Sequence, residues 1–164
     1  MIQIYDVVII GGGPGGIGAA VEAKVLGLKS ILMIEKGDNH SQTIRKFYKD
    51  NKRVDKNYKG QEIELRGTID FRDGTKESTL NYFDSLLDSG EIDSAFNSEV
   101  ESITKEGDEF HIVTTKAGYR AKNVVVAIGT MGKPNKPDYT LPISLKERIN
   151  FNLNKCSQGE KLLI

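Results

Sequence analysis

Cysteine is almost absent from this sequence of 164 residues, in which Cys156 is the only one. A single thiol excludes an internal disulfide and any metal site built from several cysteines. The two histidines, His40 and His111, are separated from each other and from Cys156 along the chain. We therefore expect no bound metal, and the lone thiol fits a reducing compartment.

The sequence also lacks an excess of charge of either sign. It has 23 Lys and Arg residues and 23 Asp and Glu residues, which sum to zero. A neutral chain of one domain's length has no long-range field toward nucleic acid or an anionic membrane. No apolar run approaches the roughly 20 residues that cross a bilayer, and the first residues do not read as a signal peptide. These absences predict a cytoplasmic protein with no nucleic-acid partner and no membrane span.

Three short apolar runs are typical of strands that are buried on both faces of a parallel sheet. They are Ile4–Ile10 (IYDVVII), Ser30–Glu35 (SILMIE) and Asn123–Ile128 (NVVVAI). Between the first two runs, apolar residues recur at helical spacing from Ile17 onward, and Gly27 is a plausible helix stop. The chain is thus expected to open with a strand, a helix and a parallel strand.

The rest of the chain predicts a second helix and a small antiparallel meander. Leu80, Phe83 and Leu87 share one face of a predicted helix over Thr75–Leu87. Turn residues separate three predicted strands. These strands are Ala95–Ile103, Glu109–Thr115 and Tyr119–Ala121. Residues 36–60 are polar and predict a long surface excursion without regular structure.

Three glycines form the pattern G-x-G-x-x-G directly after the first predicted strand and before the first predicted helix. In this context Gly11 permits a tight turn, Gly13 lets the backbone approach a pyrophosphate, and Gly16 allows close packing of helix on strand. Pro14 suits the first turn of the helix, where its missing N–H is no loss. The pattern predicts a three-layer α/β fold of the Rossmann-like type that binds a dinucleotide, with the first helix on one face of the sheet and the meander on the other.

An acidic residue at the end of the second strand supports this interpretation. Glu35 lies 24 residues after Gly11, near the offset of about 20 expected for a carboxylate that accepts hydrogen bonds from a ribose. Its charge would repel a 2′-phosphate, so these residues predict FAD or NAD at the turn and not NADP. Lys36 follows directly and is included in the predicted cofactor-binding set. A tight turn without a ligand is the alternative.

Three stretches resemble the FAD domain of thioredoxin-reductase-like pyridine nucleotide-disulfide oxidoreductases: Asp6–Gly16, Ile34–Gly37 and Val124–Thr130. The resemblance implies that the last stretch closes against FAD. It gives weaker support to Val100, on the strand that passes the adenine ring in the family, and to His40, Ser41 and Gln42. No residue is assigned a catalytic role. Fingerprint and resemblance together predict cofactor-binding residues Gly11, Gly13, Pro14, Gly16, Glu35, Lys36, Val100, Ala127, Gly129 and Thr130.

The resemblance also implies how the chain is divided. Residues 1–132 would be the N-terminal segment of a discontinuous FAD-binding domain. Residues 133–164 would be a connector followed by the first strand, Lys161–Ile164, of an NAD(P)H-binding domain that is cut short. The NADPH or NADH site would then lie outside this sequence, and the fragment alone is expected to be inactive.

The function that the resemblance implies is electron transfer from NAD(P)H through FAD to an acceptor such as flavodoxin, ferredoxin, a quinone or a small disulfide. Family members that reduce thioredoxin carry a C-x-x-C in the stretch that corresponds to residues 147–159, where only Cys156 stands here. This departure favours the dithiol-free branch. A true thioredoxin reductase and an NAD-dependent dehydrogenase domain are the alternatives, and a homodimer is left open. The basic stretch Arg45–Lys59 is either a solvated face or a docking surface for an acidic carrier.

Overall fold

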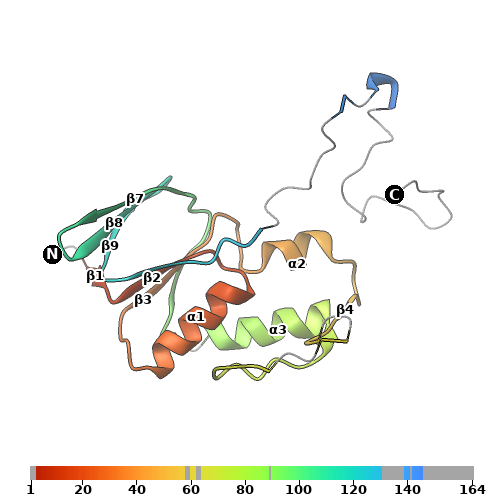
Figure 1. Cartoon of the computed structure of the whole chain (residues 1–164), viewed down its shortest axis with the longest axis horizontal. Coiled ribbons are helices and arrows are strands. Elements are labelled where there is room, and N and C mark those ends of the chain that lie inside the picture. The colour runs from red at the N-terminus through yellow and green to blue at the C-terminus, as the bar shows by residue number, and fades with distance from the viewer. Residues whose placement is uncertain are drawn as a thin grey trace.

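A four-stranded parallel sheet forms the centre of the molecule (Figure 1). The computed structural model of the chain describes residues 3–57, 60–61, 64–88, 90–130, 139–140 and 142–145. The strands of this sheet are β2 (Val7–Ile10), β3 (Ile31–Ile34), β6 (Asp93–Ala95) and β10 (Val124–Val126). They pair in parallel in the order β10-β2-β3-β6. The parallel sheet expected from the apolar runs is confirmed. The expected burial of the third run is wrong, because β10 lies at the edge of the sheet and its Val125 and Val126 are exposed.

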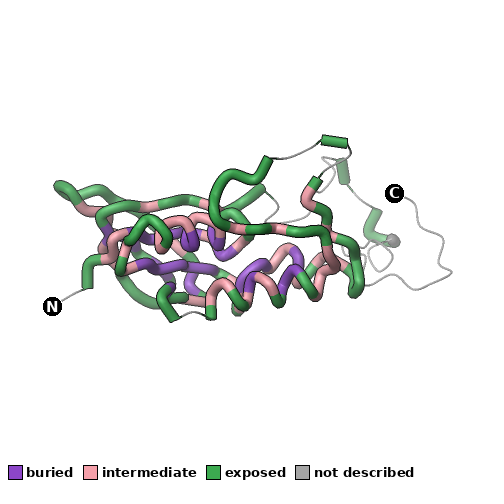
Figure 2. The backbone as a smooth tube through the Cα atoms, turned by 90° about the horizontal axis from the view of Figure 1, so that it is seen from below, coloured by how far each residue is buried: buried purple, intermediate pink, exposed green. Residues whose placement is uncertain are grey.

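Both faces of β2 and β3 are covered. Successive side chains on these strands point to opposite faces of the sheet, and each face packs into its own hydrophobic core. Ile9 and Met33 face helices α1 (Pro14–Val25) and α3 (Lys76–Leu87). The neighbouring residues on each strand, which point to the opposite face, pack against the antiparallel meander. They are Val8, Ile10, Leu32 and Ile34. Figure 2 shows the buried positions in the sheet and on the helices that cover it. The predicted three-layer order of helices, parallel sheet and meander is confirmed.

Helix α3 begins where its sequence provides a cap. The N–H of Ser78 donates to Thr75 Oγ1 over 3.3 Å, and the N–H of Thr75 donates to Ser78 Oγ over 2.9 Å. This reciprocal pair satisfies two of the N–H groups that a helix start leaves open. Leu80 and Phe83 are buried against the sheet, as their spacing predicted.

The meander is a second sheet, in which one strand comes from the start of the chain. Its strands are β1 (Ile4–Tyr5), β7 (Val100–Glu106), β8 (Glu109–Thr114) and β9 (Gly118–Ala121), in the order β1-β9-β8-β7. β1 pairs with β9 in parallel, and the other pairs are antiparallel.

Two predicted strands were wrong in extent, because each is divided between the two sheets. The run Ile4–Ile10 breaks at Asp6, so that β1 joins the meander and β2 the parallel sheet. The run Ala95–Ile103 ends in the parallel sheet at Ala95 and resumes as β7 at Val100. Asn97 between them has a left-handed backbone, with φ of 53°, which no strand continues through.

The polar stretch of residues 36–60 has more structure than predicted. It contains α2 (Gln42–Phe47) and β4 (Arg53–Val54), which pairs with β5 (Gly74–Thr75). Helix α2 is too short for a periodic pattern, and among its residues only Ile44 is buried. A short 3₁₀ helix covers Ile143–Leu145.

Some predictions fall on other parts of the chain. Cys156 and the strand predicted at Lys161–Ile164 lie outside the described residues, and the division of the chain at residue 132 stays a prediction. Across the ranges described above, no helix is long and apolar enough to cross a bilayer.

Asp6 is expected to make the stability of the fold depend on pH. Hydrogen bonds from the Lys122 ammonium and then from the N–H groups of Lys29 and Ser30 hold the pKa of the Asp6 carboxyl below its ordinary value of 3.8. The stabilisation is therefore present above pH 3.8 and is lost as the pH falls through the lower, folded-state value. Asp6→Asn should lower the urea midpoint at pH 7, and the difference from wild type should shrink in acid.

An exposed acidic residue in the β7–β8 turn serves as the control for this measurement. Asp108→Asn should leave the urea midpoint equal to that of wild type, within experimental error, at pH 7 and at pH 2.5. An Asp6→Asn deficit that is the same at pH 7 and pH 2.5 would show that charge is not the cause.

Candidate functional site

The glycine turn, residues Gly11–Gly16, has a geometry that only glycine permits at its two ends. Gly11 has φ of +108°, and a Cβ atom there would lie 2.4 Å from the carbonyl oxygen of Ala127. A Cβ atom on Gly16 would lie 1.8 Å from the carbonyl oxygen of Gly11. The first and last glycines of the fingerprint are therefore required by the packing of the turn itself.

The middle glycine faces open space. Gly13 has an ordinary extended backbone, with φ of −81° and ψ of 180°, and no heavy atom lies within 4 Å of a Cβ placed there. Helix α1 begins at Pro14 with no capping side chain and no acidic residue in its first turn. An uncapped helix start presents N–H groups and the positive end of the helix dipole to an anion. The turn therefore fits a diphosphate group.

Glu35 lies against the glycine turn, directly after β3, and is 9% exposed. Its Oε2 accepts from the N–H of Gly12 over 2.8 Å, and its Oε1 accepts from the N–H of Gly37 over 2.8 Å. A carboxylate accepts up to about four hydrogen bonds, so it retains capacity for ribose hydroxyls. The prediction from sequence missed Gly12, whose N–H ties the carboxylate to the turn. The three consecutive glycines, Gly11–Gly13, were the feature of the sequence that could have indicated Gly12.

Backbone hydrogen bonds hold the loop that follows Glu35 to the glycine turn and to the segment after β6. The N–H of Ser41 donates to the carbonyl oxygen of Gly12 over 2.7 Å. On the other side, the N–H of Ser98 donates to the carbonyl oxygen of Glu35 over 3.0 Å, and that of Asn97 to Gly37 over 2.7 Å. The carboxylate is therefore held in place before any ligand arrives.

The structure brings some of the other predicted residues to the turn and leaves others apart. Ala127 packs on Gly11, and its N–H donates to the carbonyl oxygen of Ile10 over 2.8 Å. Gly129 and Thr130 follow on an exposed segment, in which Gly129 has φ of +65°. Lys36 is exposed, and Val100 packs beside the second core at the start of β7. No described contact joins these last two side chains to the turn.

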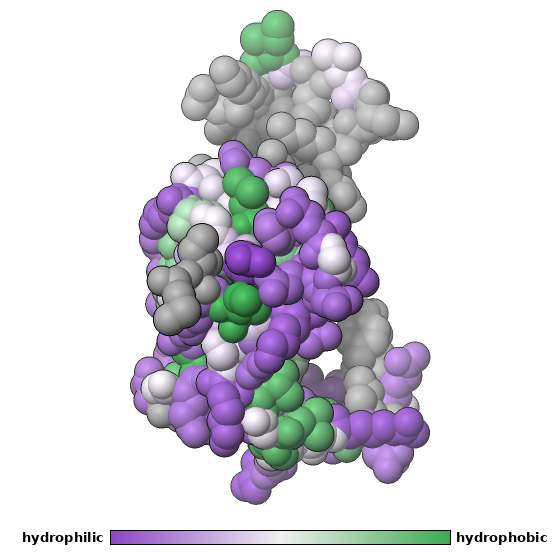
Figure 3. All heavy atoms as spheres, turned by 90° about the vertical axis from the view of Figure 1, so that its left-hand side faces the viewer, coloured by the Kyte–Doolittle hydropathy of each residue, from purple (hydrophilic) through white to green (hydrophobic). Residues whose placement is uncertain are grey.

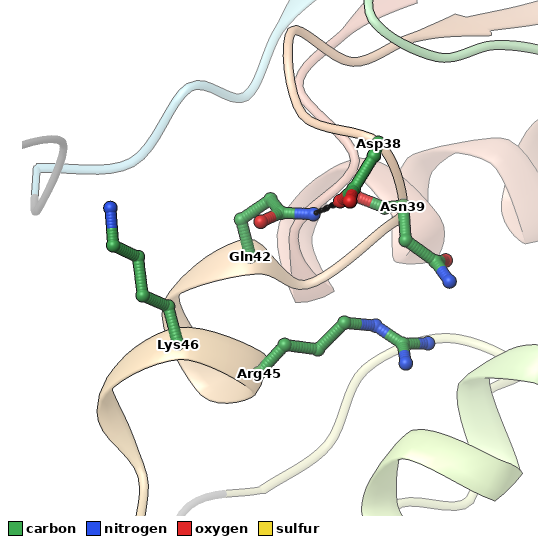
Figure 4. A pocket seen from close by; sticks show the side chains of 5 residues that line it. All are labelled: Asp38, Asn39, Gln42, Arg45 and Lys46. Carbon is green, nitrogen blue, oxygen red and sulfur yellow. Dashed lines mark hydrogen bonds between the residues drawn. The ribbon is translucent and has the colours of Figure 1, made fainter. Parts of the chain in front are cut away.

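A pocket of about 410 Å³ lies beside the loop that follows Glu35 (Figure 4). It is lined by Asp38, Asn39, Gln42, Arg45 and Lys46. Gln42 donates to the Asp38 carboxylate over 2.7 Å across it. None of the glycines of the turn lines this pocket, so it is a neighbour of the turn and not part of it.

A parallel sheet with a glycine turn between its first strand and helix, and with a carboxylate at the end of the next strand, defines a dinucleotide-binding α/β protein. Among the described residues, no group of three or more His, Cys, Asp or Glu side chains is placed to hold a metal ion. Comparison with known sequences agrees with this class. The chain belongs to the pyridine nucleotide-disulphide oxidoreductase family, whose sequence model matches residues 8–164.

Individual relatives cover the chain well. A ferredoxin–NADP reductase of Streptococcus pneumoniae is 26% identical over 166 residues, which span 100% of this chain and 48% of that protein. The chain thus spans about half the length of the curated relatives it matches.

Solved structures agree with the fold. A bacillithiol disulfide reductase from Bacillus cereus superposes with a TM-score of 0.66 at 29% identity, covering 83% of this chain and 43% of that one. A thioredoxin reductase from T. acidophilum superposes with a TM-score of 0.59 at 27% identity, covering 80% of this chain and 37% of that one.

These matches confirm the family that the sequence resembled, together with the Rossmann-like fold class. The relatives named above are themselves reductases, of ferredoxin and NADP, of bacillithiol disulfide and of thioredoxin.

Proposed function

We propose that the glycine turn holds the diphosphate of FAD and that Glu35 accepts hydrogen bonds from its adenosine ribose. The observation that carries this proposal is the opening at Gly13, where an uncapped helix start faces free space beside a buried, pre-positioned carboxylate. The first turn of α1 carries no acidic side chain, so the helix start offers its amide donors to the diphosphate. Ala127, Gly129 and Thr130 would close against the same cofactor.

The whole protein, on this proposal, is an FAD-dependent NAD(P)H oxidoreductase. Bound FAD would accept a hydride from NADPH or NADH and pass the electrons on singly or in pairs. The part of this chain is to bind and orient the cofactor, because no described acid, base or nucleophile is placed for a chemical step. The match of ferredoxin–NADP reductases along the entire chain supports a small electron carrier as the acceptor.

The basic stretch Arg45–Lys59 offers less free charge to such a carrier than its sequence suggested. Arg53 pairs with Asp55 and lies 3.5 Å from an Asp73 carboxylate oxygen. Lys49 and Lys52 are exposed, so an acidic carrier would dock through them. The Lys49→Glu and Lys52→Glu double variant should slow reduction of the carrier at low salt, and an unchanged rate would exclude this surface.

Gly13→Ala tests the diphosphate site without disturbing the fold. Alanine adopts the backbone of Gly13 freely, and its Cβ meets no protein atom. The added methyl group would occupy the space through which the diphosphate approaches. We expect the melting temperature to stay within about 2 °C of wild type while the Kd for FAD, measured by quenching of flavin fluorescence, rises about tenfold or more.

Gly18→Ala is the matched control on the same helix. Its Cβ makes only an ordinary contact with Ile69, 3.8 Å away. This variant should bind FAD as wild type does and gain about 0.5–1 kcal/mol of stability. Equal FAD binding by Gly13→Ala and wild type would exclude the turn as the diphosphate site. Titration with NAD in place of FAD distinguishes the dehydrogenase alternative.

A further inference from the structure

A polar cluster, buried at His40 and Ser41 and partly exposed at Arg45 and Asp84, connects the glycine turn to helix α3. Its members are His40, Ser41, Arg45 and Asp84, which we call the His40 cluster. His40 is 1% exposed and Ser41 2% exposed. A fully buried imidazole is held only where both ring nitrogens find partners. The sequence predicted a cofactor contact for His40 and Ser41 only weakly and gave no hint of Asp84.

Each ring nitrogen of His40 has a defined partner. Nε2 lies 2.7 Å from Asp84 Oδ1, and Nδ1 lies 3.0 Å from Ser41 Oγ. Nε2 also faces a terminal nitrogen of Arg45, which only donates, whereas the Asp84 carboxylate only accepts, so the role of Nε2 depends on the tautomer of the ring. The Ser41 hydroxyl both donates and accepts, so it completes the bonding at Nδ1. The ring therefore links helix α3 to Ser41.

Arg45 closes the cluster from helix α2. Its Nε donates to the carbonyl oxygen of His40 over 2.9 Å, and its terminal nitrogen donates to Asp84 Oδ1 over 3.3 Å. The same terminal nitrogen lies 2.7 Å from His40 Nε2. The ring of His40 also meets the edge of Phe83 at 6.3 Å between centroids. Backbone and side chain of His40 are thus both fixed.

Ser41 has a conformation that its surroundings must impose. Its backbone is left-handed, with φ of 53° and ψ of 40°, which is unfavourable for a residue other than glycine. Three hydrogen bonds hold it there: the hydroxyl to His40, the carbonyl oxygen from the N–H of Arg45 over 3.0 Å, and the N–H to the carbonyl oxygen of Gly12 over 2.7 Å. The last of these reaches the glycine turn.

We infer that His40 and Asp84 are positioning residues for the dinucleotide site. Asp84 fixes the imidazole, the imidazole fixes Ser41 in its left-handed conformation, and the Ser41 N–H holds Gly12 at the place where its own N–H meets Glu35. The inference rests on the proposed function, since it assigns these residues to the preparation of that site. Neither side chain touches the turn directly.

Two substitutions of His40 test its contact with Asp84 and its contact with Ser41 separately. His40→Gln keeps an amide near the position of Nε2, facing Asp84, and gives up the bond to Ser41. His40→Asn keeps an amide near Nδ1, facing Ser41, and gives up the bond to Asp84. Asp84→Asn removes the charge from the anchor. The matched control is Asp88→Asn, one turn further along at the exposed end of α3.

The test combines amide hydrogen exchange with FAD binding in the full chain, well below the melting temperature. We expect both His40 variants and Asp84→Asn to speed the exchange of the Ser41 amide and to raise the Kd for FAD, each roughly tenfold. The Asp88→Asn control should match wild type in both measurements. A residue with a merely structural role would lower the melting temperature and leave the FAD affinity of the folded protein unchanged.

The outcomes separate the inference from the proposed function. Wild-type exchange at Ser41 and wild-type affinity in all three variants would overturn the inference, as would an equal effect of Asp88→Asn. A wild-type protein that does not bind FAD contradicts the proposed function instead. In that case the exchange rate of the Ser41 amide still decides whether His40 and Asp84 hold the turn.

Discussion

Gly16→Ala is expected to unfold the glycine turn and with it the start of helix α1. A Cβ atom at this position would lie 1.8 Å from the carbonyl oxygen of Gly11 and 3.0 Å from its carbonyl carbon. Both atoms belong to the backbone between β2 and the helix, so no side-chain rotation relieves the clash. Helix and strand must separate, which also disturbs the contact of Ile17 with the core.

The expected cost of this substitution is about 3 kcal/mol or more, at the upper end of overpacking effects. FAD binding should be lost at the same time. Urea unfolding followed by circular dichroism measures the first effect and fluorescence quenching the second. Gly18→Ala places the same methyl group on the opposite face of the helix and should be neutral or stabilising. Equal midpoints for Gly16→Ala and wild type would contradict the packing of this turn.

Glu35→Gln should impair both the turn and the cofactor site while changing the side-chain shape very little. Both carboxylate oxygens accept from backbone N–H groups, those of Gly12 and Gly37. Glutamine has one oxygen to offer, so its NH₂ group must face one of these donors. A buried N–H left without an acceptor costs about 1–3 kcal/mol. The loss of charge also weakens the acceptor that the ribose hydroxyls would use.

We expect the FAD Kd of Glu35→Gln to rise at least about tenfold and the urea midpoint to fall. The control is Glu101→Gln, in which an exposed carboxylate on β7 is replaced by the same amide. It should match wild type in both measurements. A Glu35→Gln protein with wild-type stability would show that the two backbone donors do not depend on the carboxylate.

The elements whose signal is local were predicted well. The buried runs of β2 and β3 and the helical spacing of Leu80 and Phe83 reflect burial on fixed faces, which the sequence records directly. Strand β10 pairs with β2 as expected, but it is not buried, since Val125 and Val126 are exposed. The edge strand β6 was not recognised as part of the parallel sheet, because Asp93 and Ser94 are exposed and give it no apolar pattern.

The glycine fingerprint predicted the place of the turn, but not how the turn is held. The bonds from Gly12 to Glu35 and from Ser41 to Gly12 join residues 23 and 29 positions apart. The pairing of His40 with Asp84 spans 44 positions. Such contacts depend on how loop 36–41 and helix α3 pack, and no periodicity in the sequence encodes them.

The possible homodimer stays a prediction. The face of the molecule turned to the viewer in Figure 3 is mostly hydrophilic, with small separate hydrophobic groups. Stable interfaces bury about 800 Å² per partner around a continuous core. Sedimentation of the purified protein would decide this point.

A crystal structure of the complete gene product with FAD tests the central claim most directly. The account predicts the diphosphate within hydrogen-bond distance of the backbone N–H groups at Gly13 and the start of α1. It also predicts the adenosine ribose against the Glu35 carboxylate, which keeps its bonds to Gly12 and Gly37. FAD bound elsewhere with the glycine turn empty, or a Glu35 side chain turned to solvent, would contradict it.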